Sequence, residues 1–320
     1  MRKSALISIS MLLTMLSLAA KGETPVPIYG KLSVQGTQIV DTSGNSRTLR
    51  GVSFGWHNWH TRFYNAETVK WLKDDWHCTV VRAAMGIEPW DGYLANPDSS
   101  KATIEKVIKG AIDEGIYVIV DWHSHGLHTN EAKRFFGEMA SKYADCPNII
   151  WELYNEPINQ SWDNLKQYFS AIIDTIRTHC TDNIILVGNP HWNQDIHIVA
   201  DSPLNGYDNI MYTMHFYAGT HRQELRDRCN YALSKGIPIF ISECGSSEAS
   251  GNGNIDIEQW NTWIDWCELN DISWVQWHIA DKDESSAMLK PGAQSLGNWA
   301  ESALSKSGAL TRDKLLELNK

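Results

Sequence analysis

Strand-type runs of β-branched and aromatic residues recur eight times along the chain and alternate with helical patterns. They start near residues 51, 79, 117, 149, 184, 210, 238 and 274, about 26 to 38 residues apart, which is the length of a strand-plus-helix unit. The helical patterns fall over residues 65–76, 100–114, 130–144, 161–180, 193–200, 222–235, 257–270 and 297–306. This alternation predicts an α/β fold, a (β/α)8 barrel of the TIM type.

The barrel is expected to form a single domain. A doubly wound sheet split into two domains is the structural rival, but nothing in the composition marks a linker. Residues 31–50 alternate in polarity and contain the turn sequence Asp41-Thr42-Ser43-Gly44-Asn45. We therefore predict an N-terminal β-hairpin that closes the bottom of the barrel.

The first 21 residues have the pattern of an export signal. Arg2 and Lys3 precede an apolar run from Ala5 to Leu18, and the small residues Ala19 and Ala20 follow it. The run is too short and too early for a membrane-spanning helix. We predict a signal peptide over residues 1–21, a folded region over residues 22–320, and a secreted or periplasmic protein that does not associate with membranes.

Charge and cysteine content narrow the class of partner. The net charge of −10 argues against nucleic acid and anionic membranes, which favour basic surfaces, so a neutral substrate fits better. The six cysteines show no CxxC spacing and no cluster with histidine, which argues against a zinc site. Buried free thiols are the favoured interpretation. Export would permit disulfides, but the spacing of the cysteines does not determine which of them would pair. We expect no metal, no cofactor and a monomer.

Tryptophan is unusually frequent, at 15 of 320 residues. Part of this number is core, because tryptophan buries a large area. Seven tryptophans fall in or beside predicted loops and strand ends, where flat aromatic rings suit the apolar faces of sugars: Trp56, Trp59, Trp90, Trp122, Trp162, Trp192 and Trp277.

Two of the strand-type runs end in a glutamate. Ile149-Ile150-Trp151-Glu152-Leu153-Tyr154-Asn155-Glu156-Pro157 stops at a proline, which withholds a backbone donor, and Pro238-Ile239-Phe240-Ile241-Ser242-Glu243-Cys244-Gly245 stops at a glycine. The carboxyl ends of barrel strands meet on one face, where active sites collect. Glu156 and Glu243 are therefore candidates for a reaction that needs one protonated and one ionised carboxyl group.

Other strand ends are polar or aromatic too. They carry Arg82, His123, Asn155, Asn189 with His191, His215 with Tyr217, and Trp277. Alternation places Thr213, His215 and Tyr217 on one side of their strand. Both Asn155 and Glu156 can point inward only where the strand loses its pleat.

Each of these residues also has a purely structural interpretation. Arg82 could pair with Glu152, which would otherwise be a lone buried charge. His123 and His215 could be satisfied interior histidines, and Asn155 could be a turn residue before proline.

The sequence around Asn155-Glu156-Pro157 resembles the signature of glycoside hydrolase family 5. Residues 30 to 305 are similar to the catalytic barrel of its bacterial endo-β-1,4-glucanases, with further matches at Val-Val-Arg82, Asp-Trp-His123, Met-His215-Phe-Tyr217, Ser-Glu243-Cys-Gly and Asp-Lys282-Asp-Glu284-Ser-Ser. The resemblance implies a glycoside hydrolase that cuts internal bonds of cellulose or related β-glucans by a retaining, double-displacement mechanism.

The resemblance also implies a role for each matching residue. Glu156 is implied to be the acid/base and Glu243 the nucleophile, with carboxyl groups roughly 5 Å apart. Substrate-binding roles are implied for Arg82, His123, Asn155, His215, Tyr217, Trp277, Trp59, Lys282 and Glu284. In this scheme Arg82 and Tyr217 hold Glu243 ionised, Asn155 binds the sugar 2-hydroxyl, and Trp59 and Trp277 stack on sugar rings.

The match departs from the family pattern at two positions. Relatives often carry a sugar-binding histidine where Gly55 stands, so His57 or His60 is a candidate replacement. Relatives often have an aromatic residue near the position of Gly86. These departures leave open the choice among cellulose, mixed-linkage glucan, xyloglucan and mannan as substrates.

Two alternatives come from other classes. A metal-dependent amidohydrolase on the same barrel would use His123, His125, His191, His215 and Asp281 as ligands, but no strand-end lysine is available to bridge two metals. A carbohydrate-binding barrel without catalysis would explain the tryptophans but does not need Glu156 and Glu243 together.

Overall fold

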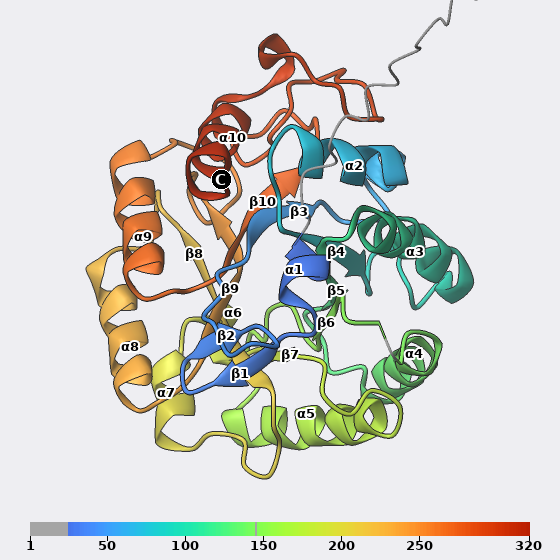
Figure 1. The fold of residues 1–320 in the computed structure, drawn as a ribbon, viewed down its shortest axis with the longest axis vertical. Helices are drawn as coiled ribbons and strands as arrows, with labels where there is room; N and C mark the ends of the chain where they lie inside the picture. The colour runs from blue at the N-terminus through green and yellow to red at the C-terminus, as the bar shows by residue number, and fades with distance from the viewer. Residues whose placement is uncertain (1–24, 145) are drawn as a thin grey trace, which may run out of the picture.

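The computed structural model describes residues 25–144 and 146–320 and contains a closed barrel of parallel strands (Figure 1). Going round the ring, β10 is followed by β3, β4, β5, β6, β7, β8 and β9, so each strand pairs with its neighbours in the sequence and the ring closes between β10 and β3. The strands are β3 (Arg50–Phe54), β4 (Val80–Gly86), β5 (Tyr117–His123), β6 (Ile149–Glu152), β7 (Ile185–Val187), β8 (Ile210–Tyr217), β9 (Ile239–Gly245) and β10 (Trp274–Ile279). The predicted (β/α)8 barrel is confirmed.

Helices surround the barrel and occupy most of the predicted positions. They are α2 (Ala66–Asp74), α3 (Pro97–Glu114), α4 (Thr129–Lys142), α5 (Trp162–Arg177), the short α6 (Pro190–Asn193), α7 (Ile196–Asp201), α8 (Gln223–Ser234), α9 (Ile257–Leu269) and α10 (Lys306–Leu318). Local sequence sets several ends: the side chains of Asn65, Ser161 and Asp256 accept hydrogen bonds from backbone N–H groups of the first turn. None of the described helices is long and apolar enough to cross a membrane.

The last helix was predicted in the wrong place. Residues 297–305 contain only the 3-10 turn η2 (Glu301–Ala303). The helix α10 begins at Lys306, after Ser305, whose side chain accepts a hydrogen bond from the N–H of Gly308. Gly297 and Asn298 have positive φ angles, which end regular structure there. The polar Ser-Lys-Ser-Gly sequence at the start of α10 is a helix cap, but it lacks the apolar spacing that marks a helix in a sequence.

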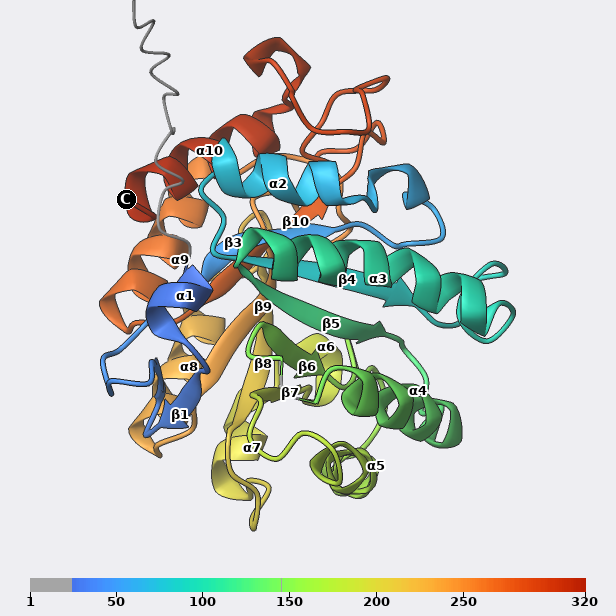
Figure 2. The same cartoon turned by 45° about the vertical axis from the view of Figure 1, so that its right-hand side comes forward.

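The N-terminal hairpin is present, but its turn lies earlier than predicted. β1 (Ser33–Gln35) and β2 (Gln38–Val40) pair antiparallel around Gly36, with φ +60°. The Asp41–Asn45 segment forms a second turn, in which the Asp41 carboxylate accepts hydrogen bonds from the N–H groups of Ser43 and Asn45. Figure 2 shows β1 and α1 (Pro25–Tyr29) at the end of the barrel where the strands start.

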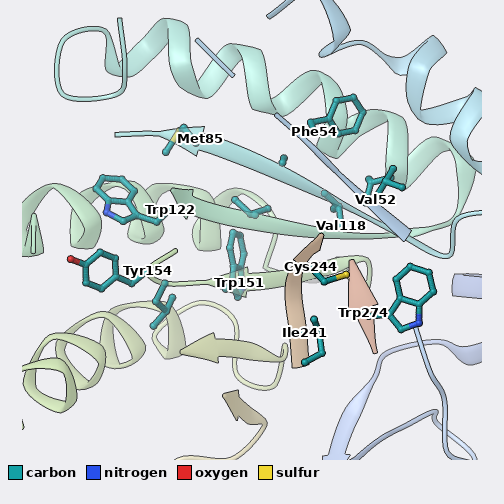
Figure 3. Close-up of a cluster of buried hydrophobic side chains, with 14 of the residues drawn as sticks. Val52, Phe54, Met85, Val118, Trp122, Trp151, Tyr154, Ile241, Cys244 and Trp274 are labelled. Carbon is teal, nitrogen blue, oxygen red and sulfur yellow. The ribbon is translucent and has the colours of Figure 1, made fainter. Parts of the chain in front are cut away.

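Two apolar clusters hold the barrel. One lies between the strands and the helices and includes Trp122, Trp151 and Trp274 (Figure 3). The other joins the β1–β2 hairpin to residues near the strand starts: Leu32, Ile39, Leu49, Val80, Tyr117, Ile119, Ile150, Ile184, Leu186, Met211, Phe240 and Val275. We call this second cluster the lower layer. Trp122 and Trp162 belong to the core, so the suggestion that their rings could stack on sugars is wrong.

The six cysteines are all free thiols, as favoured from the sequence. Cys146 is partly exposed, and the other five are buried in the structure. The signal-peptide prediction for residues 1–21 lies outside the described residues.

Candidate active site

A cleft of about 620 Å³ opens where the barrel strands end. Most of the residues singled out from the sequence line it: Trp59, His123, Asn155, Glu156, Tyr217, Glu243, Trp277, Lys282 and Glu284. Arg82 and His215 lie beneath these side chains and contact them directly. The two strand-end residues of β7 are not among the lining residues: Asn189 is buried and donates to the Thr213 carbonyl, and His191 points to solvent near Asp195.

The two strand-end glutamates face each other in the cleft. Oxygen atoms of Glu156 and Glu243 and a ring nitrogen of His215 all lie within 4.8 Å of one another. This separation is close to the ~5–5.5 Å typical of retaining glycosidases and shorter than the ~6.5–9.5 Å of inverting ones. At this separation one carboxylate can attack the anomeric carbon itself, as the retaining mechanism requires.

The two carboxyl groups have different surroundings. Burial raises the pKa of Glu156 to about 7, against the opposing influence of His125 and Arg82. Glu243 accepts hydrogen bonds from the Tyr217 hydroxyl at 2.7 Å and from Arg82 Nη1 at 3.1 Å. Glu156 is thus suited to hold a proton near neutral pH, while Glu243 is bonded as a carboxylate.

Arg82 is the centre of a buried network. Its Nε donates to Glu152 at 2.7 Å, its Nη2 donates to Asn155 at 2.7 Å and lies 2.9 Å from Asp121, and its Nη1 reaches Glu243. One guanidinium therefore pairs with Glu152, as in the structural interpretation, and also contacts Glu243 and Asn155 in the cleft.

Three carboxyl groups share this single cation. Burial raises the pKa of Asp121 to about 7 and also raises the pKa of Glu152, although Arg82 opposes both shifts. Burial works against the charged form of Arg82, but Asp121, Glu152 and Glu243 outweigh it and raise the pKa of the guanidinium. The network is stable only while Arg82 supplies its charge.

The two histidines of the site are neutral, with defined tautomers. Burial lowers the pKa of His215 to about 4 and lowers that of His123 well below its ordinary value. Asn193 Nδ2 lies 3.2 Å from His215 Nε2 and donates to it, which leaves the Nδ1–H to donate to Glu156 at 2.9 Å. His123 donates from Nδ1 to Asp121 at 2.7 Å, and its ring stacks on Trp277 at 5.2 Å.

The chain leaves regular pairing before it reaches Asn155 and Glu156. β6 ends at Glu152, and the next residues are irregular, so both side chains turn inward without the bulge that was considered. Backbone bonds to the neighbouring β5 segment replace the ladder: the Asn155 N–H donates to the Trp122 carbonyl, and the Glu156 N–H donates to the Ser124 carbonyl. Asn193 Nδ2 also donates to the Asn155 carbonyl.

The outer part of the cleft is aromatic and polar. Trp59 is 55% exposed, and Lys282 forms an ion pair with Glu284. His60 lines the cleft, whereas His57 is buried and accepts a hydrogen bond from the Gly86 N–H at 2.9 Å. Of the two histidines considered near Gly55, His60 is therefore the one in the cleft.

Several site residues were missed by the sequence analysis. Asp121 lies two residues before His123 on the same strand face, so alternation could have found it. Ser242 donates to Glu152 at 2.7 Å, and it precedes Glu243 at a register shift between β8 and β9 that no sequence pattern indicates. His278, which lines the cleft, was also missed, whereas Trp56, another lining residue, was already among the tryptophans named from the sequence.

The ligand set of the alternative metal enzyme is not assembled. Among the described residues, a group close enough to hold a metal ion consists of Glu156, His215 and Glu243. Asp281 instead forms an ion pair with Arg62 and accepts a hydrogen bond from the Gly292 N–H. His191 lies beside Asp195 on the surface.

Comparisons with known proteins agree with this geometry. An endoglucanase of Clostridium saccharobutylicum is 44% identical over 293 residues, which cover 89% of this chain and 65% of that protein. Endoglucanase N of Pectobacterium atrosepticum is 42% identical, over 94% of this chain and 68% of its own length. The chain spans only 60% of endoglucanase 5 of Pectobacterium carotovorum, so these relatives are longer proteins.

Solved structures are similar over nearly the whole barrel. A structure from Cytophaga hutchinsonii has a TM-score of 0.91 at 47% identity, covering 93% of this chain and 98% of that one. The catalytic domain of a Thermobifida fusca endoglucanase has a TM-score of 0.88 at 34% identity, covering 92% and 100%, and a variant of it was solved with cellotetraose. The family described as cellulase (glycosyl hydrolase family 5) matches residues 40–283, and this chain belongs to that family.

Proposed function

We propose that this chain is a retaining endo-β-1,4-glucanase that hydrolyses internal bonds of unbranched β-glucans. The observation that carries the proposal is the pair of carboxyl groups of Glu156 and Glu243, within 4.8 Å of each other and in different environments. The names of the relatives, and the cellotetraose complex of the Thermobifida fusca domain, support a glucan as the substrate.

The first step forms a glycosyl-enzyme. The Glu243 carboxylate attacks the anomeric carbon, the bond to the leaving sugar breaks, and the Glu156 carboxyl group gives its proton to the departing oxygen. The pKa of Glu156, about 7, keeps this proton in place at neutral pH. His215, neutral and donating to Glu156 from Nδ1, fixes the orientation of the acid without taking its proton.

The second step releases the sugar. Glu156, now ionised, takes a proton from a water molecule, whose oxygen attacks the anomeric carbon and frees Glu243. Two inversions restore the starting configuration. Arg82 and Tyr217 hold the oxygens of Glu243 in place before and after this step, and Asn155, bonded to Arg82, lines the cleft with both glutamates.

Glu243→Ala tests the nucleophile. We expect hydrolysis of cellotetraose to fall by about 10⁴-fold or more, binding to be retained, and azide to restore part of the turnover on an aryl cellobioside. Glu258→Ala, on the outer helix α9, is the matched control and should keep full activity. Unchanged turnover of Glu243→Ala would remove Glu243 from its proposed role.

Product stereochemistry tests the mechanism independently. The first products seen by NMR should have the β-configuration of the substrate, and prompt formation of the α-anomer would contradict the two-step scheme.

EDTA should leave the rate unchanged if the chain is not the metal-dependent alternative. A panel of carboxymethylcellulose, lichenan, xyloglucan, glucomannan and xylan separates the preferences that the site geometry leaves open.

We also infer export of the chain from the apolar run Ala5–Leu18. N-terminal sequencing of the protein from the culture medium or periplasm should give a start near residue 22. An intact Met1 in the active protein would contradict this inference.

A further inference from the structure

Gly55 and Gly86, the two glycines noted in the sequence analysis, lie beneath aromatic side chains. A Cβ atom on Gly86 would lie 2.7 Å from Trp56 Cε3 and 2.7 Å from Asn58 Oδ1. A Cβ on Gly55 would lie 2.6 Å from ring carbons of both His60 and His278. The space that side chains at 55 and 86 would occupy is therefore filled from the loop after β3 and from the end of β10.

Trp56 connects the outer cleft to the centre of the site. Its ring stacks on Trp59 at 4.8 Å and meets the ring of His123 edge-on at 4.3 Å. His123 in turn stacks on Trp277. Trp56 thus lies between the exposed platform of Trp59 and the histidine beside the two carboxyl groups, and it lines the cleft.

The polar edge of Trp56 faces away from β4. Its Cε3 and Cζ3 atoms lie against Gly86, and the nitrogen-bearing edge of an indole is on the opposite side of the ring. Among residues 25–144 and 146–320, the Trp56 N–H has no hydrogen-bond acceptor. It is also not buried, so a ligand can reach it. The core residues Trp162 and Trp260, by contrast, donate to protein oxygens.

We propose that Trp56 is a substrate-contacting residue of this cleft, whose indole N–H donates to a sugar hydroxyl between the reacting unit at His123 and the outer unit at Trp59. Its ring fills the space that a side chain at Gly86 would need. The substrate that suits the indole N–H of Trp56 is an unsubstituted β-glucan chain, because such a chain has a free hydroxyl group where the N–H donates. The inference rests on the proposed glucanase function.

Trp56→Phe tests the N–H directly, because phenylalanine keeps a ring against Trp59 and His123. We expect KM for cellotetraose to rise about five- to tenfold while kcat stays within threefold, since a binding contact equal in ground and transition states affects KM alone. Cellotetraose affinity, measured by calorimetry in the inactive Glu243→Gln background, should fall by the same factor. Trp266→Phe, which removes an indole N–H bond to Asn230 on the outer surface, is the control.

Gly86→Ala perturbs the ring of Trp56 from β4, the strand against which the ring packs. The added methyl group must displace Trp56, so this variant should raise KM as Trp56→Ala does, and the double variant should be no worse than Trp56→Ala alone. Additive effects in the double variant would overturn the coupling. A drop in kcat without a change in KM for Trp56→Phe would assign Trp56 a structural role through His123, and unchanged affinity would overturn the proposal.

Failure of the inference and failure of the proposed function give different results. If the wild-type chain does not hydrolyse cellotetraose, or if Glu243→Gln does not impair hydrolysis, the glucanase function fails. If the wild type is active and Trp56→Phe matches it in both KM and calorimetric affinity, only the role of Trp56 fails.

Discussion

The two ends of the barrel are built from the same strands but have opposite chemistry. In the lower layer, the side chains near the strand starts are apolar, such as Ile119, Val80 and Met211. A few residues further along the same strands, the side chains are Asp121, Arg82 and His215. The side chains named at both ends are buried, so burial alone does not distinguish the core from the site.

The difference lies in how each end is stabilised. The lower layer gains stability from the many small contacts of apolar packing, which no single residue controls. The upper end depends on one cation, Arg82, which compensates Asp121, Glu152 and Glu243. Substitutions in the lower layer should therefore change stability without changing the chemistry, whereas substitutions in the upper network should change both.

Arg82→Met should have the largest effect. It leaves buried carboxyl groups without their cation, which is expected to cost about 3–5 kcal/mol in the free energy of unfolding and to lower kcat by about 10²–10³-fold. Asp121 and Glu152 have raised pKa values, so the folded state takes up protons more readily and the stability deficit should shrink as the pH falls from 7 to 5. Urea unfolding at several pH values measures this; a deficit independent of pH would contradict it.

Leu186→Ala tests the lower layer. Leu186 is fully buried on β7, which contributes no residue to the lining of the cleft. We expect a loss of about 2–5 kcal/mol in the free energy of unfolding, with kcat of the folded enzyme within twofold of the wild type. A fall in kcat comparable to that of Arg82→Met would show that the two ends are not independent.

The pH profile should report the acid of the upper end. Because the pKa of Glu156 is raised to about 7, its proton is present below this pH and lost above it. We expect kcat/KM to fall about tenfold per pH unit on the alkaline side, starting near pH 7. In Glu156→Gln, assayed on an aryl cellobioside whose leaving group needs no acid, this alkaline limb should be absent; if it persists, another group is responsible.

Ser242→Ala should have the smallest effect. It removes the donor to Glu152 and a neighbour of His215 Nε2 at 3.0 Å, but it leaves Arg82 in place. The expected cost is about 1–2 kcal/mol in stability, with kcat reduced about two- to fivefold. Ser247→Ala removes a buried hydroxyl that donates to the carbonyl of Glu248, and this control should leave kcat unchanged.

The features that were predictable from the sequence are those set by local periodicity. Strand-type runs and alternation gave the barrel, the strand-end position of Glu243, and the shared face of His215 and Tyr217. These patterns depend only on neighbouring residues, so no tertiary information is needed.

The remaining features depend on contacts between distant segments. The four partners of Arg82 come from three other strands and the segment after β6, and their meeting depends on barrel register. Trp56 reaches the cleft because of the conformation of the loop after β3 and the lack of a side chain at Gly86 on β4. The start of α10 is set by the capping of Ser305, which a search for apolar spacing does not detect.

Because β6 ends at Glu152, the backbone at Glu156 is held in place by hydrogen bonds to other segments. The N–H groups of Asn155 and Glu156 donate to the carbonyls of Trp122 and Ser124. The carbonyl of Pro157, the next residue, accepts a hydrogen bond from the Trp192 N–H. A shift of residues 122–124, at the end of β5, would therefore move the proton donor Glu156 as well, while the nucleophile Glu243 on β9 stays in place. The distance between the two reacting groups is governed from outside the strand that bears the acid, so engineering of this spacing should begin at residues 122–124.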